Sequence, residues 1–207
     1  MVQALPQLMS FQEFLVWKPE TGRYELHNGA IVEMQPTGSH EQVVGFLNRK
    51  LNVLIDQEEL SAFIPNTAMV RLPGSETGYK PDLLMVDQSA LEQEPLWERE
   101  SVITLGSSIQ LVVEVTSMNW PDDYARKFED YEAMGIPQYW IVDYKGLGGR
   151  RYIGNPKQPT ITVCRLEDGV YQTQLFHRGN PLISPEFPGL KLTADQIFEA
   201  GDLPLSS

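Results

Sequence analysis

The sequence predicts a single α/β domain with a mixed sheet, and two observations support this prediction. Segments with the pattern of strands alternate with segments with the period of helices along the 207 residues. The central stretch, residues 110–143, has the order strand, loop, helix, turn, strand. A unit of this length is typical of a parallel strand pair with a right-handed crossover. No internal repeat or convincing linker divides the chain, and its length suits one large domain.

Composition narrows the class of protein. Hydrophobic residues make up 42% and charged residues 21%, which predicts a soluble globule. The net charge of −12 argues against a broad nucleic-acid-binding surface, so any DNA contact would need a local basic patch or metal ions. The single cysteine, Cys164, excludes an internal disulfide and fits a reducing compartment. No apolar run of about 18 residues and no secretory signal are seen, so we expect no membrane span and a cytoplasmic location.

The N-terminal part predicts a helix, a hairpin and a longer helix. Residues 10–17 have helical spacing, with Ser10 as the cap and a glutamate three residues on in capping-box register. Asn28-Gly29, between two short apolar runs, is the strongest short hairpin signal. Ser39 is then expected to cap a helix over about residues 40–55, where apolar residues recur at helical spacing.

The next part predicts strands and a loop. Residues 62–72 have a strand pattern, although Pro65 indicates an edge, a bulge or a break. Residues 83–86 form an apolar run typical of a buried strand. Residues 88–108 are polar and irregular, which predicts an inserted loop.

The C-terminal part predicts a second hairpin and a short helix. Residues 160–166 and 170–176 flank the turn sequence Glu167-Asp168-Gly169. Thr193 can cap a last helix, and the chain from Gly201 onward is expected to fray. Residues 145–159, before this hairpin, are rich in Gly, Pro and basic residues.

Glu114 lies within the apolar run Leu111–Val115 at the start of the central unit. An ionised carboxylate is costly to bury without a partner, so Glu114 needs a cation, a metal or a proton. Pairing with a nearby arginine would satisfy it equally well. The sequence alone therefore leaves two interpretations of Glu114 open, a functional site and a structural ion pair.

The helix of the central unit has an unusual inner face. Pro121-Asp122 opens it, and Gly135 followed by a proline ends it. Its predicted core stripe is Tyr124, Phe128 and Tyr131, with Tyr131 expected to be core rather than catalytic. Lys127 falls on the same face, where an apolar residue is expected. Either Lys127 extends to water past its neighbours, or it turns toward a buried acid.

Asp82, after Pro81, and Glu114 each flank or end a strand-like apolar run, so the two runs can be neighbours. Two carboxylates that converge at one sheet edge form an oxygen site for Mg²⁺ or Mn²⁺. A nearby lysine could orient or deprotonate a water, or hold a phosphate. The alternative for a lone Pro-Asp pair is a turn, which is much commoner.

These motifs resemble the PD-(D/E)xK nuclease superfamily and, more narrowly, its Uma-two family of proposed restriction endonucleases. The resemblance covers roughly residues 24–143, and the part from EVTS to YWIVD is the most specific. It implies one restriction-endonuclease-like domain over residues 1–207, with a core over about 23–144, flanking helices, and a C-terminal hairpin extension over 145–207. The matching segments are YELHNGAIVEM, SHEQVVGFLNRKL, KPDLLMVD and LVVEVTSMNWPDDYARKFEDYEAMGIPQYWIVD.

The resemblance also implies the residues of a site. It makes Asp82 and Glu114 catalytic, metal-binding acids, with Mg²⁺ or Mn²⁺ as the ion. The superfamily lysine would normally follow Glu114 by two residues, where this chain has Thr116, and Lys127 of the following helix is the matching substitute. Two further residues match the family pattern, Glu25 and His40. Glu25 could bind metal or orient a ligand, or be a solvated hairpin residue, and His40 could serve only the helix terminus.

The implied function is that of a metal-dependent hydrolase, an endonuclease that cleaves DNA phosphodiester bonds. The usual pairing of such domains to cut two strands implies a homodimer. One alternative is a catalytically inactive binding or assembly module with the nuclease fold, which the net charge of −12 favours because phosphate binding draws on Lys and Arg. Another is a nuclease that is active only with a basic partner protein.

Overall fold

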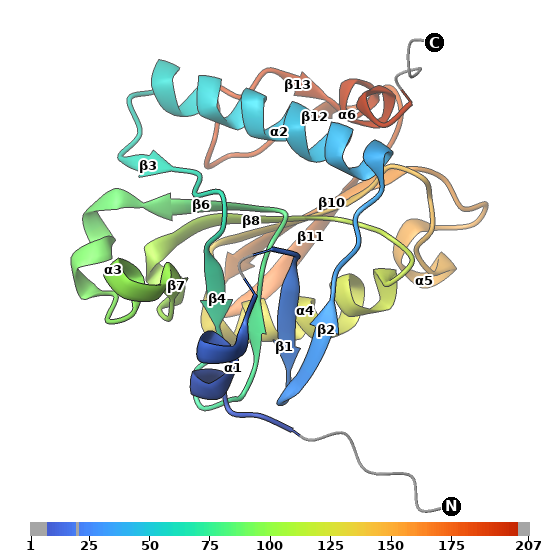
Figure 1. Cartoon of the computed structure of the whole chain (residues 1–207). Helices are drawn as coiled ribbons and strands as arrows, with labels where there is room; N and C mark the ends of the chain where they lie inside the picture. Colours follow the sequence, from blue (N-terminus) through green and yellow to red (C-terminus); the bar gives the residue numbers. More distant parts are fainter. Residues whose placement is uncertain (1–7, 20, 203–207) are drawn as a thin grey trace, which may run out of the picture.

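The computed structural model describes residues 8–19 and 21–202. Its main layer is a six-stranded mixed sheet (Figure 1), in which β8 and β9 pair in parallel and every other pair is antiparallel. This confirms the predicted α/β fold with a mixed sheet. In spatial order the strands are β11 (Val170–Phe176), β10 (Thr160–Glu167), β9 (Gln138–Asp143), β8 (Ile109–Val115), β6 (Leu83–Asp87) and β3 (Ala62–Phe63).

A second, five-stranded sheet lies beside the first, and the N-terminal hairpin belongs to it (Figure 1). Its strands, in spatial order, are β2 (Ala30–Glu33), β1 (Tyr24–His27), β5 (Gly78–Tyr79), β4 (Met69–Arg71) and β7 (Val102–Ile103). A small third sheet pairs β12 (Pro181–Leu182) with β13 (Leu192–Thr193).

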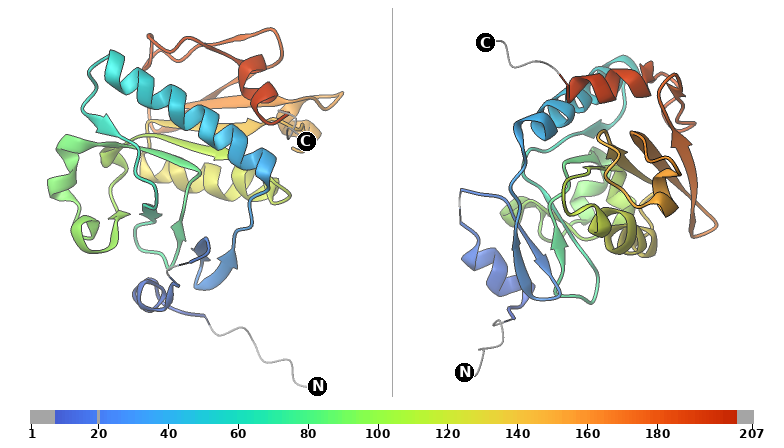
Figure 2. Two further views of the ribbon diagram at one scale, coloured as in Figure 1. Left: turned by 45° about the horizontal axis from the view of Figure 1, so that its top comes forward. Right: turned by 90° about the vertical axis from the view of Figure 1, so that its right-hand side faces the viewer.

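Helices cover both faces of the six-stranded sheet. The long helix α2 (Gly38–Gln57) and the C-terminal helix α6 (Ala194–Ala200) lie together over one face (Figure 1, Figure 2). The π-helical segment η3 (Asp122–Arg126) and the helix α4 (Lys127–Met134) lie on the other. The remaining helical segments are α1 (Phe11–Trp17), η1 (Gln88–Gln93), α3 (Trp97–Glu100), η2 (Gly106–Ser108) and α5 (Arg150–Ile153).

The alternation of side chains along β8 determines which face each residue meets. Val113 joins the core under α2, whereas Val112 joins the core under α4. Glu114 is two residues on from Val112, so it also projects toward α4. This period of two is the reason that a carboxylate in a buried strand lies opposite the helix that carries Lys127.

Several local predictions are confirmed. β6 and β8 are neighbours, with Leu83 opposite Val113. Asn28 (φ 49°) and Gly29 (φ 83°) form the predicted hairpin turn, and both adopt the positive φ that a type I′ turn requires. Gly135 ends α4 in the left-handed conformation. The capping box of Ser10 with Glu13 is present, and Thr193 caps α6.

Three predictions need correction. Thr37, and not Ser39, caps α2, which begins at Gly38; the Ser39 hydroxyl instead lies 2.9 Å from the Tyr144 hydroxyl. Residues 62–72 are not one strand. The break that Pro65 indicated is present, and the chain leaves one sheet at β3 and enters the other at β4 on either side of it.

The third correction concerns residues 88–108, which form three short helical segments and β7 rather than an irregular loop. Val102 and Ile103 are fully buried beside β4, but a two-residue strand has no periodicity to detect. The chain was predicted to fray from Gly201 onward, and residues 203–207 of this end lie outside the described residues. No helix within residues 8–19 and 21–202 has the length and apolarity needed to cross a membrane.

Candidate active site

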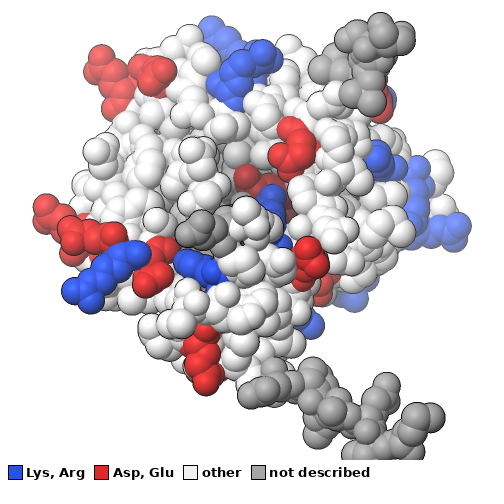
Figure 3. Space-filling model, viewed as in Figure 1, with Lys and Arg blue, Asp and Glu red and all other residues white. Residues whose placement is uncertain are grey.

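A cavity of about 420 Å³ opens where the β1–β2 hairpin, the start of α2, the end of β8 and the start of the η3–α4 helix meet. Acidic and basic side chains lie together in a hollow near the middle of this face of the molecule (Figure 3). Residues distant in sequence therefore share one cavity, whose lining includes Arg23, Glu25, His40, Asp82, Glu114 and Lys127.

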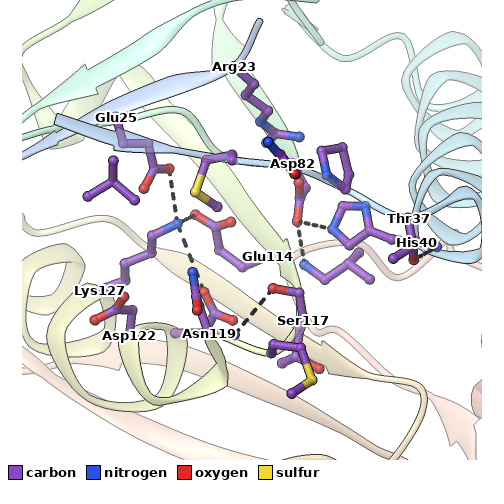
Figure 4. A pocket seen from close by; sticks show the side chains of 18 of the residues that line it. Arg23, Glu25, Thr37, His40, Asp82, Glu114, Ser117, Asn119, Asp122 and Lys127 are labelled. Atoms are coloured by element: carbon purple, nitrogen blue, oxygen red, sulfur yellow. Dashed lines mark hydrogen bonds and ion pairs between the residues drawn. The ribbon is translucent and has the colours of Figure 1, made fainter.

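Asp82, just before β6, is held between two positively charged or protonatable groups (Figure 4). Its Oδ1 lies 2.7 Å from Nη2 of Arg23, and its Oδ2 lies 3.1 Å from Nε2 of His40. The backbone N–H of Val115 donates to Oδ2 at 2.7 Å. Burial would raise the pKa of Asp82, but the hydrogen bond from His40 and the charge of Arg23 outweigh burial and lower it. Asp82 is therefore ionised.

Lys127, the first residue of α4, lies between two carboxylates (Figure 4). Its ammonium is 2.9 Å from Oε1 of Glu114 and 3.1 Å from Oε1 of Glu25. Asp123, one turn earlier in η3, is 3.9 Å away. The side chain of Lys127 is only 2% exposed, so the alternative that it extends to water is wrong. A lysine on the apolar face of this helix instead lies at the centre of a cluster of acids.

The cluster contains more carboxylates than ammonium groups, and this imbalance determines which of the carboxylates are ionised. Burial raises the pKa of Glu114 to about 7; Lys127 offsets part of this, whereas Asp82 and Glu25 add to it. Glu25 has the opposite balance: burial opposes ionisation, but Lys127 and His27 lower its pKa to about 2. Lys127 therefore helps to keep Glu25 ionised, whereas Glu114 takes up a proton as the pH falls through about 7.

Lys127 itself remains protonated. Burial alone would lower its pKa, but Glu114, Glu25 and Asp123 outweigh burial and hold the pKa well above its ordinary value. Burial raises the pKa of Asp123 well above the usual range for an aspartate. The cavity therefore contains a permanent ammonium and two acids with raised pKa values, Glu114 and Asp123, whose charge depends on what else is bound.

A second layer of hydrogen bonds orients this cluster. The His27 Nε2 lies 2.8 Å from Oε2 of Glu25, and the Arg126 guanidinium donates to Nδ1 of His27 at 2.8 Å. Because arginine has only donors, Nδ1 of His27 must accept. The hydrogen of the ring is then on Nε2, which donates its hydrogen bond to the Glu25 carboxylate. The Tyr131 hydroxyl donates to Oε1 of Glu114 at 3.0 Å. Glu25 and Glu114 each have a fixed orientation toward Lys127.

Local structure explains why these side chains converge. Glu25 is fully buried in β1, so the alternative that it is a solvated hairpin residue is wrong. The π-helical turn η3 immediately precedes Lys127, and such turns occur frequently at functional sites. Thr116, at the usual superfamily lysine position, is buried and donates to Oδ1 of Asp143 at 3.1 Å. It therefore ties β8 to the end of β9 and supplies no cation.

All five predicted residues line this one cavity, in two groups. Asp82 and His40 form one group, and Glu25, Glu114 and Lys127 form the other. Three residues that contact them were not predicted: Arg23, His27 and Asp123. Of these, only Asp123 had a detectable signal, because it is four residues before Lys127 on the same helical face. Tyr131 is fully buried in the core, as predicted, and its hydroxyl also contacts Glu114.

Two carboxylates of the cavity match the ligands that Mg²⁺ uses in proteins. Within the described residues, no three His, Cys, Asp or Glu side chains are grouped to hold a metal. Mg²⁺ typically binds one or two carboxylates and completes its shell with waters and substrate phosphates. Asp82 and Glu114 fit that pattern, since both line the cavity and an added cation would compensate the carboxylate that Lys127 leaves uncompensated.

The mixed sheet, its helices on both faces and the acid–lysine cavity define a protein of the restriction-endonuclease-like class. A crystal structure described as a "putative nuclease belonging to DUF820" from Anabaena variabilis has a similar fold. The TM-score is 0.68 at 18% identity, over 93% of this chain and 99% of that chain. The family model Uma2, described as "Putative restriction endonuclease", matches residues 11–195, so the chain belongs to this family. Membership supports a nuclease function in general. No curated protein matches the chain.

Proposed function

We propose that the protein is a Mg²⁺- or Mn²⁺-dependent endonuclease that hydrolyses DNA phosphodiester bonds. The observation that supports this most strongly is the convergence of Asp82, Glu114 and Lys127 on one cavity, with 2.9 Å between the Lys127 ammonium and Glu114. Asp82 and Glu114 would hold the ion. When bound, such an ion lowers the pKa of a coordinated water and neutralises charge on the phosphate.

The protein groups have separable roles in this proposal. Lys127 remains protonated, so it acts as a fixed positive charge beside the phosphate rather than as a base that removes a proton. Glu25 holds the Lys127 ammonium in place through the 3.1 Å contact. Arg23 and His40 orient the Asp82 carboxylate. Cleavage of both strands of a duplex would require two such cavities, so we include a homodimer in the proposal.

A second candidate function is a binding or assembly module with the nuclease fold and no turnover. The observation that favours it is the saturation of Lys127 by Glu25 and Glu114 at hydrogen-bond distance. A satisfied buried ion cluster can be purely structural. The two candidates differ in one measurable property, which is metal-dependent cleavage.

Nicking of supercoiled plasmid by the purified protein, across a range of Mg²⁺ and Mn²⁺ concentrations, tests the proposal. The wild type should nick only when the metal is present. Lys127→Met should lower the rate by roughly 10²–10³-fold, the range typical of losing one positioned electrostatic group. Arg49→Gln on α2, outside the cavity lining, is the matched loss of one charge and should leave the rate unchanged. Equal rates for the wild type and Lys127→Met would show that Lys127 has no catalytic role. No nicking by the wild type would favour the binding module.

A further inference from the structure

The charge of this acidic protein is unevenly distributed along the chain. The whole sequence has a net charge of −12, yet residues 144–166 contain no Asp or Glu. This stretch follows β9 directly and includes α5. The same stretch contains five basic residues: Lys145, Arg150, Arg151, Lys157 and Arg165.

Four of these cations are exposed and uncompensated. Among the described residues, no carboxylate lies within 4.0 Å of Lys145, Arg150, Arg151 or Lys157. Arg165, at the end of the stretch, differs because it pairs with Glu167 and Glu186. Figure 3 shows Lys and Arg side chains gathered at the right-hand edge of the molecule, where Figure 1 draws α5. We call residues 145–157 the basic segment.

Aromatic rings connect the basic segment to the helix that carries Lys127. The Lys157 ammonium lies 5.9 Å from the ring centre of Trp120, and the Arg151 guanidinium lies 5.8 Å from that of Tyr152. Tyr152 stacks on Tyr124 of η3 with 4.8 Å between ring centres. Cations over aromatic faces keep their charge while their aliphatic stems pack, so these groups remain available to an anion.

Hydrogen bonds anchor the basic segment beside the candidate active site. The buried Asp143 carboxylate accepts from the backbone N–H groups of Leu147 (2.8 Å) and Gly148 (2.7 Å). It also accepts from the hydroxyl of Thr116, two residues after Glu114. A Cβ on Gly148 would approach Asp143 Oδ2 to 3.0 Å, so glycine permits this close packing. Lys145 and Leu147 line the cavity itself.

We infer that the basic segment is the surface that binds the phosphate backbone of duplex DNA and delivers it to the cavity. The inference rests on the proposed nuclease function. Contacts from Lys and Arg to phosphates supply sequence-independent affinity and position the duplex. On a protein of net charge −12, these contacts must come from a local region that is free of carboxylates, and the basic segment provides one at the cavity mouth.

Fluorescence anisotropy of a labelled 20-base-pair duplex, in EDTA to prevent cleavage, tests this inference across salt concentrations. Arg150→Gln with Arg151→Gln should weaken binding about tenfold or more. It should also make the slope of log K against log salt shallower by roughly 2, about one unit for each lost phosphate contact. Arg150→Lys with Arg151→Lys keeps both charges and should keep most of the affinity.

The matched control is Arg49→Gln with Lys50→Gln on α2, which removes the same charge outside the cavity lining and should leave binding and slope unchanged. Thermal melting verifies that each variant folds. Equal binding by the wild type and the Arg150/Arg151 glutamine variant would overturn the inference. So would binding of the wild type to vesicles of anionic lipid but not to the duplex.

The inference and the proposed function fail separately. If the basic segment binds DNA but the wild type never nicks it with Mg²⁺ or Mn²⁺, the nuclease proposal fails and the inference stands. If the wild type nicks plasmid and the glutamine variant does so with unchanged KM, the inference fails and the nuclease proposal stands.

Discussion

At the scale of single residues, the protein depends on one buried ammonium that several carboxylates share. Lys127 neutralises Glu25 and partly compensates Glu114, and all three side chains are almost completely buried. Removing one partner of a buried ion pair leaves the other charge uncompensated, which is far more costly than the pair is worth. Stability and the proposed activity therefore depend on the same contacts.

This dependence predicts the stability of Lys127→Met. The variant should lose about 3–5 kcal/mol of unfolding free energy at pH 8, because Glu25 and Glu114 then face each other without a cation. A second change, Glu25→Gln, should restore a large part of that loss. Chemical denaturation of the wild type, both single variants and the double variant measures the coupling. If Lys127→Met alone were as stable as the wild type, the ion cluster would have no structural role.

Glu114 gives a prediction with a definite pH dependence. Its folded pKa of about 7 is raised above the ordinary glutamate value of 4.5. Because the pKa is higher in the folded state, Glu114 adds to the free energy of unfolding when it is protonated. This contribution is complete below pH 4.5 and is lost as the pH rises through 7. Glu114→Gln removes this titration, so in EDTA the variant should lose less stability than the wild type between pH 5 and pH 8. If the wild type and Glu114→Gln lost the same free energy of unfolding between pH 5 and pH 8, the raised pKa of Glu114 would be contradicted.

The sequence indicated part of this cluster. An acid within a strand-like apolar run and a lysine on an apolar helical face each signalled a buried charge. The sequence could not show which charges meet, because Glu25 is 102 residues from Lys127 and their contact depends on tertiary packing. For the same reason Arg23 gave no signal, although it lies 2.7 Å from Asp82.

At the scale of elements, the position of the η3–α4 helix determines whether Lys127 reaches the acids. The C-terminal end of this helix packs closely on η2. A Cβ on Gly106 would lie 2.1 Å from the carbonyl oxygen of Met134 and 3.0 Å from its carbonyl carbon. Backbone atoms cannot move aside as a flexible side chain can, so any larger residue at position 106 must displace the helix.

Gly106→Ala should therefore destabilise the protein by about 1–3 kcal/mol, the range typical of overpacking. Gly45→Ala is the control, because a Cβ on Gly45, which is exposed within α2, meets nothing within 4 Å. That change should stabilise by roughly 0.5–1 kcal/mol through helix propensity. Thermal melting compares the two variants. A Gly106→Ala protein as stable as the wild type would show that η2 and α4 are less closely packed than described.

Elements with long periodic patterns could be predicted, and short ones could not. β6, β8, β9 and α2 each have enough residues to show an apolar run or a helical stripe. β3 and β7 have two residues each, and their pairing is determined by the neighbours that the chain finds in space. The cap of α2 was misassigned because Thr37 and Ser39 are both good caps and lie two residues apart.

At the scale of the whole molecule, charge is divided between two regions. Acids gather in the cavity, and uncompensated cations gather in the basic segment beside it. A divalent ion in the cavity and a phosphate backbone on the basic segment would each meet charge of the opposite sign. The net charge of −12 therefore does not exclude a DNA substrate, although that charge, taken by itself, favours the non-catalytic alternative.

The proposed activity depends on a divalent ion that Asp82 and Glu114 hold beside Lys127. The most direct measurement is the anomalous scattering of Mn²⁺ in crystals of the wild type soaked with the ion. We predict one anomalous peak between the two carboxylates, about 2.0–2.3 Å from an oxygen of each, that disappears in Glu114→Gln crystals. Well-diffracting wild-type crystals soaked in Mn²⁺ that show no peak there, or the same peak in Glu114→Gln crystals, would contradict the claim.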